Sequence, residues 1–98
     1  MQCRFRDKDL ERLYTDPTFL GGFAPELVAL FRRRVQALFA ATDERDLYAH
    51  KSLHYEHLHG KRQHQRSIRL NQQWRLVLEV EPTASGRVLV IVALEDYH

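Results

Sequence analysis

Apolar residues in the first half of the chain recur at intervals of three and four, which is the period of an amphipathic α-helix. The first such stripe covers Lys8–Tyr14 and follows Asp7, whose carboxylate can cap the helix. A longer stripe runs from Pro25 to about Ala41, and proline suits the first turn because its missing N–H has no partner there. A third, shorter helix is predicted over Glu44–Ala49.

After His50 the apolar period changes to two, which predicts β-strands. The strand patterns, one of which precedes the first helix, cover Gln2–Arg6, Tyr55–Leu58, Gln65–Leu70, Trp74–Val80 and Arg87–Leu94. The last of these is almost entirely apolar, as in a central strand that is buried on both faces. Turns are predicted at Gly60–Gln63, Asn71-Gln72 and Pro82–Gly86.

This order of helices followed by strands predicts an α+β fold. We expect two to three N-terminal helices, packed on one face of an antiparallel or mixed sheet of four to five strands. Residues 1–98 are expected to form a single domain. The other face of the sheet would be free to bind a partner. Arg69 and Arg75, on either side of the Asn71-Gln72 turn, would both lie on that face.

Composition narrows the class of protein. The chain is 44% hydrophobic and contains only four glycines and three prolines, which indicates a folded domain rather than a disordered one. Its longest apolar run, Val88–Leu94, is far shorter than the ~20 residues of a membrane helix. The residues that follow Met1 contain no apolar segment of the kind found in secretory signals, so we expect a cytoplasmic protein. With Cys3 as the only cysteine, an intrachain disulfide is excluded.

Positive charge is concentrated in one segment. Residues 50–75 contain six Lys or Arg residues and one acid, a balance of +5, whereas the whole chain has a net charge of +2. Five of the six histidines also lie there. A concentrated basic segment in a small domain is typical of proteins that bind polyanions such as nucleic acids. A solvated surface with no ligand explains the charge equally well.

The chain ends in Asp96-Tyr97-His98, which brings together a carboxylate, a phenol and an imidazole. These are the groups that general acid–base catalysis uses, and they follow the most strand-like segment. The alternative is a frayed polar tail. No phosphate-binding glycine loop, dinucleotide-binding glycine pattern or nucleophile elbow occurs in the sequence.

Two further groups of residues have alternative interpretations. His54, His57 and His59 suggest metal ligands, but His54 and His59 would lie on opposite faces of a strand and no cysteine adds to them. We therefore expect no metal ion and no other cofactor. Arg69 and Arg75 form a possible phosphate clamp, and structural ion pairs with acids such as Glu79 or Glu56 are equally plausible.

Three stretches resemble HigB-type toxins of the RelE/ParE superfamily, from type II toxin–antitoxin modules. The family pattern is Leu-Lys-Gly-(Asp/Lys)-Arg, then Ser-Ile-Arg-(Ile/Leu)-Asn-x-Gln-(Trp/Tyr)-Arg, and a closing Asp-Tyr-His. The stretches that carry the resemblance here are Leu58–Arg62, Ser67–Leu76 and Glu95–His98. The combination of the arginine hairpin and the closing tripeptide is specific, although either motif alone would be weak.

The resemblance implies a RelE-like fold and a ribosome-dependent endoribonuclease that cuts mRNA, inhibiting translation and growth. It also implies neutralisation by a HigA-like helix-turn-helix antitoxin, through which the complex would bind operator DNA. Two alternatives remain. One is a ParE-like toxin that inhibits gyrase on the same fold, and the other is a non-catalytic nucleic-acid-binding or corepressor module.

The resemblance also implies site residues. Asp96, Tyr97 and His98 match the family's closing catalytic cluster, with His98 as the leaving-group acid, and Arg75 matches the arginine near the scissile phosphate. His59 stands where the family has a lysine, and Glu56 stands where some members have a histidine; Glu56, alone or with a histidine, is the candidate general base. The expected RNA contacts are His57, Lys61, Arg62, Arg66 and Arg69.

Overall fold

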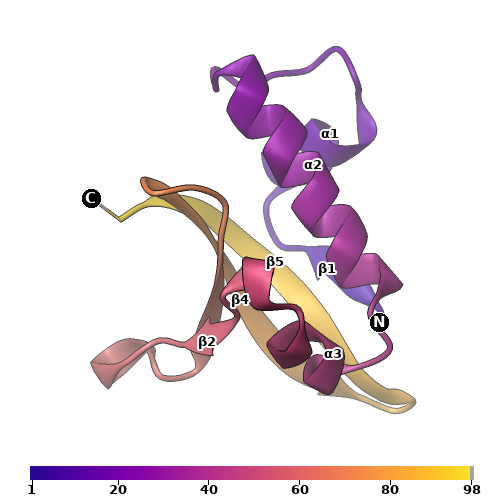
Figure 1. Cartoon of the computed structure of the whole chain (residues 1–98). Helices are drawn as coiled ribbons and strands as arrows, with labels where there is room; N and C mark the ends of the chain where they lie inside the picture. The colour runs from indigo at the N-terminus through magenta and orange to yellow at the C-terminus, as the bar shows by residue number, and fades with distance from the viewer. Residues whose placement is uncertain (98) are drawn as a thin grey trace.

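The computed structural model describes residues 1–97 and confirms the predicted α+β fold (Figure 1). Its helices are α1 (Lys8–Thr15), α2 (Pro25–Ala40) and α3 (Glu44–Ala49), with the 3₁₀ turns η1 (Lys51–Leu53) and η2 (Gly60–Arg62). Its strands are β1 (Cys3–Phe5), β2 (Glu56–His57), β3 (Gln65–Arg69), β4 (Trp74–Thr83) and β5 (Gly86–Asp96). No helix within residues 1–97 is both long and apolar enough to cross a membrane.

Local side-chain chemistry explains where the helices begin. An oxygen of the Asp7 carboxylate accepts hydrogen bonds from the N–H groups of Asp9 and Leu10, at 2.8 and 3.1 Å. Asp43 caps α3 through the N–H of Arg45, at 2.9 Å. Pro25 occupies the first turn of α2, as predicted. Each of the three helices ends within one residue of its predicted boundary.

The sheet has the strand order β1-β5-β4-β3-β2 and is mixed. Neighbouring strands from β5 to β2 are antiparallel, and β1 pairs with β5 in parallel. The predicted turn at Pro82–Gly86 was too long, because Pro82 and Thr83 pair with Arg87 and Gly86 in the β4–β5 hairpin. Gly86 has a φ of 133°, which favours glycine and lets the hairpin close over two residues.

One face of the sheet and the three helices enclose the hydrophobic core. The largest fully buried side chains come from both layers: Leu13, Phe31, Leu38, Leu47, Leu53, Ile68, Leu76, Leu78, Leu89 and Ile91. Figure 1 shows α2 running alongside the long β4–β5 hairpin. Tyr55 is also buried in this core and is 6% exposed.

We call the opposite side of the sheet the open face. Strand alternation and register place on it the side chains of Arg4, Arg6, Glu56, Gln65, Ser67, Arg69, Arg75, Val77, Glu79, Glu81, Val88, Val90 and Glu95. Val77 and Val90 are nevertheless buried, at 1% and 0% exposure. Long polar side chains on their neighbours therefore shield the middle of this face from water.

Candidate active site

A small polar cavity of about 100 Å³ lies at one end of the open face. Its lining consists of His54, Glu56, Ser67, Arg69, Arg75 and Tyr97. The sheet register explains this convergence, because Glu56 is the cross-strand partner of Ser67 and Arg69 is the partner of Arg75. Four residues that the sequence analysis selected, Glu56, Arg69, Arg75 and Tyr97, therefore meet in one concave site.

Tyr97 lies between the two arginines of the cavity. Its hydroxyl accepts a hydrogen bond from Nε of Arg69 at 3.0 Å and donates one to the carbonyl oxygen of Asn71 at 3.2 Å. The guanidinium carbon of Arg75 lies 5.3 Å from the centre of the Tyr97 ring, which is a cation–π distance. Tyr97 therefore helps to fix both cations, even though it is the penultimate residue of the chain.

The loop of residues 70–73 holds the end of β5 in place. Oδ1 of Asn71 accepts hydrogen bonds from the N–H groups of Gln73 and Trp74, both at 2.8 Å, which folds the loop back on itself. Gln73 then donates from Nε2 to the Asp96 carboxylate at 2.8 Å and accepts from the Tyr97 N–H at 3.0 Å. The chain end through Tyr97 is thus attached to the sheet.

The structure describes two residues of the predicted catalytic tripeptide, Asp96 and Tyr97. Asp96 is the cross-strand partner of Trp74, so its side chain lies on the other face of the sheet from Tyr97. Asp96 is exposed and does not line the cavity. His98, the predicted leaving-group acid, lies outside the described residues.

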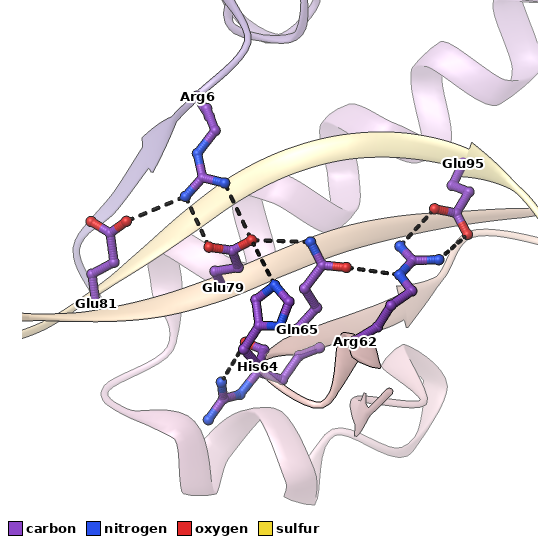
Figure 2. A network of polar contacts seen from close by, with 8 residues as sticks. Arg6, Arg62, His64, Gln65, Glu79, Glu81 and Glu95 are labelled. Atoms are coloured by element: carbon purple, nitrogen blue, oxygen red, sulfur yellow. Dashed lines mark hydrogen bonds and ion pairs between the residues drawn. The ribbon is translucent and has the colours of Figure 1, made fainter. Parts of the chain in front are cut away.

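Glu95 is the main electrostatic partner in this region, and sequence reasoning did not select it. Its carboxylate accepts hydrogen bonds from both terminal nitrogens of Arg62, at 3.0 and 2.8 Å, and from Nε of Arg75 at 3.1 Å (Figure 2 shows the Arg62 pair). These contacts, foremost those from Arg62, lower the pKa of the Glu95 carboxyl to about 2. At neutral pH the region therefore contains an ionised carboxylate beside its arginines.

A β-bulge explains why the sequence did not reveal this pair. Arg75 and Glu95 are cross-strand partners, but the register of β4 against β5 shifts between Val77 and Leu78. Strict alternation from the turn at Ala84 and Ser85 therefore assigns the wrong partners beyond the shift. From the sequence, Glu79 and Glu56 are the candidate ion-pair partners, whereas the observed partner of Arg75 is Glu95.

The remaining predicted site residues are dispersed. Arg66 alternates with the open-face residues of β3, so it lies on the helix side, where its Nε is 3.6 Å from Glu44. His57 is exposed on β2, and His59 and Lys61 are exposed at η2; none of the three lines the cavity. The +5 segment therefore does not form one continuous basic surface on the open face.

His54 also lines the cavity, although it is not among the site residues predicted from the sequence. It has φ 49° and ψ 49°, the left-handed conformation that ends η1 just before β2. Histidine tolerates this region better than bulky or β-branched residues do. Within residues 1–97, no three His, Cys, Asp or Glu side chains converge as potential metal ligands.

The fold is shared with a known class of toxins. A solved YoeB/ParE toxin from Agrobacterium tumefaciens superposes with a TM-score of 0.58 over 100% of both chains, at 16% sequence identity. This likeness identifies the architecture as the RelE-like fold. Sequence comparison then gives the family.

A family model described as the RelE-like toxin of the type II toxin–antitoxin system HigB matches residues 3–98. Toxin HigB-1 from Vibrio cholerae serotype O1 is 33% identical over 79 residues, which cover 81% of this chain and 83% of the relative. The chain therefore belongs to the HigB-like toxin family, which confirms the resemblance found in the sequence. As a type II toxin it has an antitoxin partner.

Proposed function

We propose that this toxin is a ribosome-dependent endoribonuclease that cleaves mRNA and thereby inhibits translation and growth. The observation that carries the proposal is the cavity in which Arg69, Arg75 and Tyr97 converge beside Glu56. Two guanidiniums at one concave site suit a phosphodiester, because each offers several donors to its oxygens. The adjacent carboxylate supplies a proton acceptor, which a phosphate-binding surface alone does not need.

The proposed reaction needs three kinds of group. Glu56 takes the proton of the ribose 2′-hydroxyl, whose oxygen attacks the adjacent phosphorus while the bond from phosphorus to the 5′ oxygen breaks. Arg75 and Arg69 stabilise the negative charge that develops on the phosphoryl oxygens. His98 donates a proton to the departing 5′ oxygen, and Asp96 orients His98. The products are a 2′,3′-cyclic phosphate and a 5′-hydroxyl end.

Tyr97 orients the substrate in this scheme. Its ring already packs with the guanidinium of Arg75, and its hydroxyl is bound by Arg69. A tyrosine held in this way offers a rigid surface on which a base can stack. Stacking would place the phosphate next to that base within reach of both arginines, as a positioned reaction requires.

The proposed setting is the bacterial cytoplasm. The partners are the ribosome with its mRNA and a HigA-like helix-turn-helix antitoxin, through which the complex binds operator DNA. The ribosome's contribution is to hold the mRNA in a reactive geometry, because alignment of the 2′-oxygen with phosphorus accounts for much of the barrier in such reactions.

Mapping mRNA 5′ ends in cells that express the toxin tests this proposal. We expect new 5′-hydroxyl ends within translated regions, and we expect them to disappear in the Arg75→Ala variant. Arg33→Ala is a matched control, because Arg33 is exposed on α2, outside the cavity. Growth arrest with intact mRNA and broken DNA would instead indicate a gyrase inhibitor. Growth arrest with both intact would indicate a non-catalytic binding protein.

A further inference from the structure

A row of polar contacts crosses the open face and ends at Glu95, the ion-pair partner of Arg75 (Figure 2 shows the row as far as Glu95). At one end Arg6, the residue that follows β1, binds Glu79 of β4, at 2.9 and 3.2 Å. Glu79 accepts from Nε2 of Gln65 at 3.0 Å, and Oε1 of Gln65 accepts from Nε of Arg62 at 2.9 Å. Arg62 in turn binds Glu95. The row therefore links the end of β1 with β4, β3, η2 and β5.

Glu95 differs from the other acids of this row because it contacts a cavity residue. Glu79 and Glu81 pair with Arg6, and neither of them lines the cavity. The Glu95 carboxylate instead holds Arg62 on one side and Arg75 on the other. Of these two arginines, only Arg75 lines the cavity.

We propose that Glu95 is a positioning residue that fixes the guanidinium of Arg75 for the phosphate in the cavity. This inference rests on the proposed nuclease function. Arg75 contacts Glu95 through Nε and one terminal nitrogen, and its guanidinium carbon lies 5.3 Å from the centre of the Tyr97 ring. A guanidinium has five N–H donors, so donors remain for a phosphodiester after Glu95 is bound. Without Glu95, the contact with the Tyr97 ring would be the one left among residues 1–97 to hold the long, flexible Arg75 side chain.

The charges give this proposal a distinctive kinetic signature. A carboxylate beside the cavity repels the phosphodiester, so Glu95 weakens binding while it improves the geometry of Arg75. Arg62 and Arg75 together carry two positive charges against the single negative charge of Glu95, so the region still attracts RNA. Replacing Glu95 by a neutral residue should therefore lower kcat without raising KM. A side chain with only a structural role would not produce this separation.

Cleavage of mRNA on programmed ribosomes tests the inference through kcat and KM. We expect Glu95→Gln to lower kcat about tenfold or more, since small misplacements of a catalytic group have effects of this order or greater. KM should stay unchanged or fall. Glu95→Asp should recover part of kcat, because it restores the charge on a shorter side chain. Glu81→Gln, the same chemical change at the far end of the row, should leave both constants unchanged.

A double variant identifies the arginine through which Glu95 acts. In the Arg75→Ala background, Glu95→Gln should lower kcat no further, because the group it positions is absent. An additional tenfold loss in that background would overturn the inference. So would parental kcat and KM in Glu95→Gln alone.

A measurement on the isolated protein separates this inference from the nuclease proposal. In a nitrogen-15 NMR spectrum, the Nε–H signal of Arg75 should shift and broaden in Glu95→Gln, while that of Arg6 stays in place. An unchanged Arg75 signal would refute positioning by Glu95, whether or not the protein cleaves RNA. If the parental toxin does not cleave mRNA on ribosomes, the nuclease proposal fails, and the NMR result still decides how Arg75 is held.

Discussion

At the scale of single residues, Arg75 is the side chain on which the proposed chemistry depends most directly. It lines the cavity and contacts both Glu95 and the ring of Tyr97. Arg75→Ala should lower the cleavage rate on the order of 10²-fold or more, the usual cost of removing a donor to developing negative charge. Single-turnover cleavage on ribosomes measures this loss. A parental rate in Arg75→Ala would remove this residue from the mechanism.

His98 gives a second prediction at this scale. If it is the leaving-group acid, deleting it or replacing it by Gln should reduce cleavage on the order of 10²-fold or more and leave the folded domain intact. Asp96→Asn should cost less, because its proposed role is to orient His98. Thermal unfolding must be measured beside each rate, since loss of fold would imitate loss of chemistry. A His98-deleted protein that still cuts mRNA normally would exclude the tripeptide as the source of the acid.

The ionisation of Glu95 predicts how stability depends on pH. Its pKa is about 2 in the folded protein and 4.5 ordinarily, so the folded state binds fewer protons between these values. The stabilisation is therefore fully present above about pH 4.5 and is lost as the pH falls towards 2. At neutral pH we expect Glu95→Gln to lower the free energy of unfolding by about 1–2 kcal/mol.

Denaturant unfolding at a series of pH values measures this dependence. The difference between the parental protein and Glu95→Gln should shrink steadily as the pH falls from about 4.5 to 2. A difference that stays constant over this range would mean that hydrogen bonding or packing, and not ionisation, is the source of the effect.

At the scale of elements, η2 presents Lys61 to solvent beside the arginine that Glu95 binds. Each phosphate contact adds nearly one to the slope of log affinity against log salt. Lys61→Ala should therefore reduce this slope for ribosome or RNA binding by about 1 and leave the choice of cut sites unchanged. Binding titrations from low to moderate salt test this. An unchanged slope would show that η2 does not contact the nucleic acid.

The elements themselves follow from local patterns, whereas the site depends on their register. Periodicity, Asp7 and Pro25 give the helix boundaries to within one residue. The alternation of Trp74–Val80 correctly separates the core side of β4 from the open face. The pairing of Arg75 with Glu95 depends on a bulge that no local pattern in the sequence marks.

Composition predicts charge but not which charges are already paired. The basic segment contains six cations, of which Arg62 and Arg75 bind Glu95 and Arg66 lies beside Glu44. Glu44 is distant in sequence and becomes a neighbour only when α3 packs near β3. Long-range contacts of this kind are set by tertiary packing, which a count of residues along the chain does not contain.

At the scale of the whole molecule, the helices and the sheet have different roles. The helices bury one face of the sheet and make it rigid, and the opposite face presents a cavity built from β2, β3, β4 and the end of β5. Side chains on rigid strands are held more closely than side chains on loops, which suits a site that must align a 2′-oxygen with phosphorus. The loop of residues 70–73 extends this rigidity to Tyr97.

The central claim is that the cavity on the open face cleaves mRNA on the ribosome. The most direct measurement incubates purified toxin with ribosomes programmed with a labelled mRNA and compares parental protein, Arg75→Ala and Arg33→Ala. We predict a defined cut with a 5′-hydroxyl end for the parental protein and for Arg33→Ala, and no cut for Arg75→Ala within the same time. Intact mRNA with the parental protein, or equal cleavage by all three, would contradict the account.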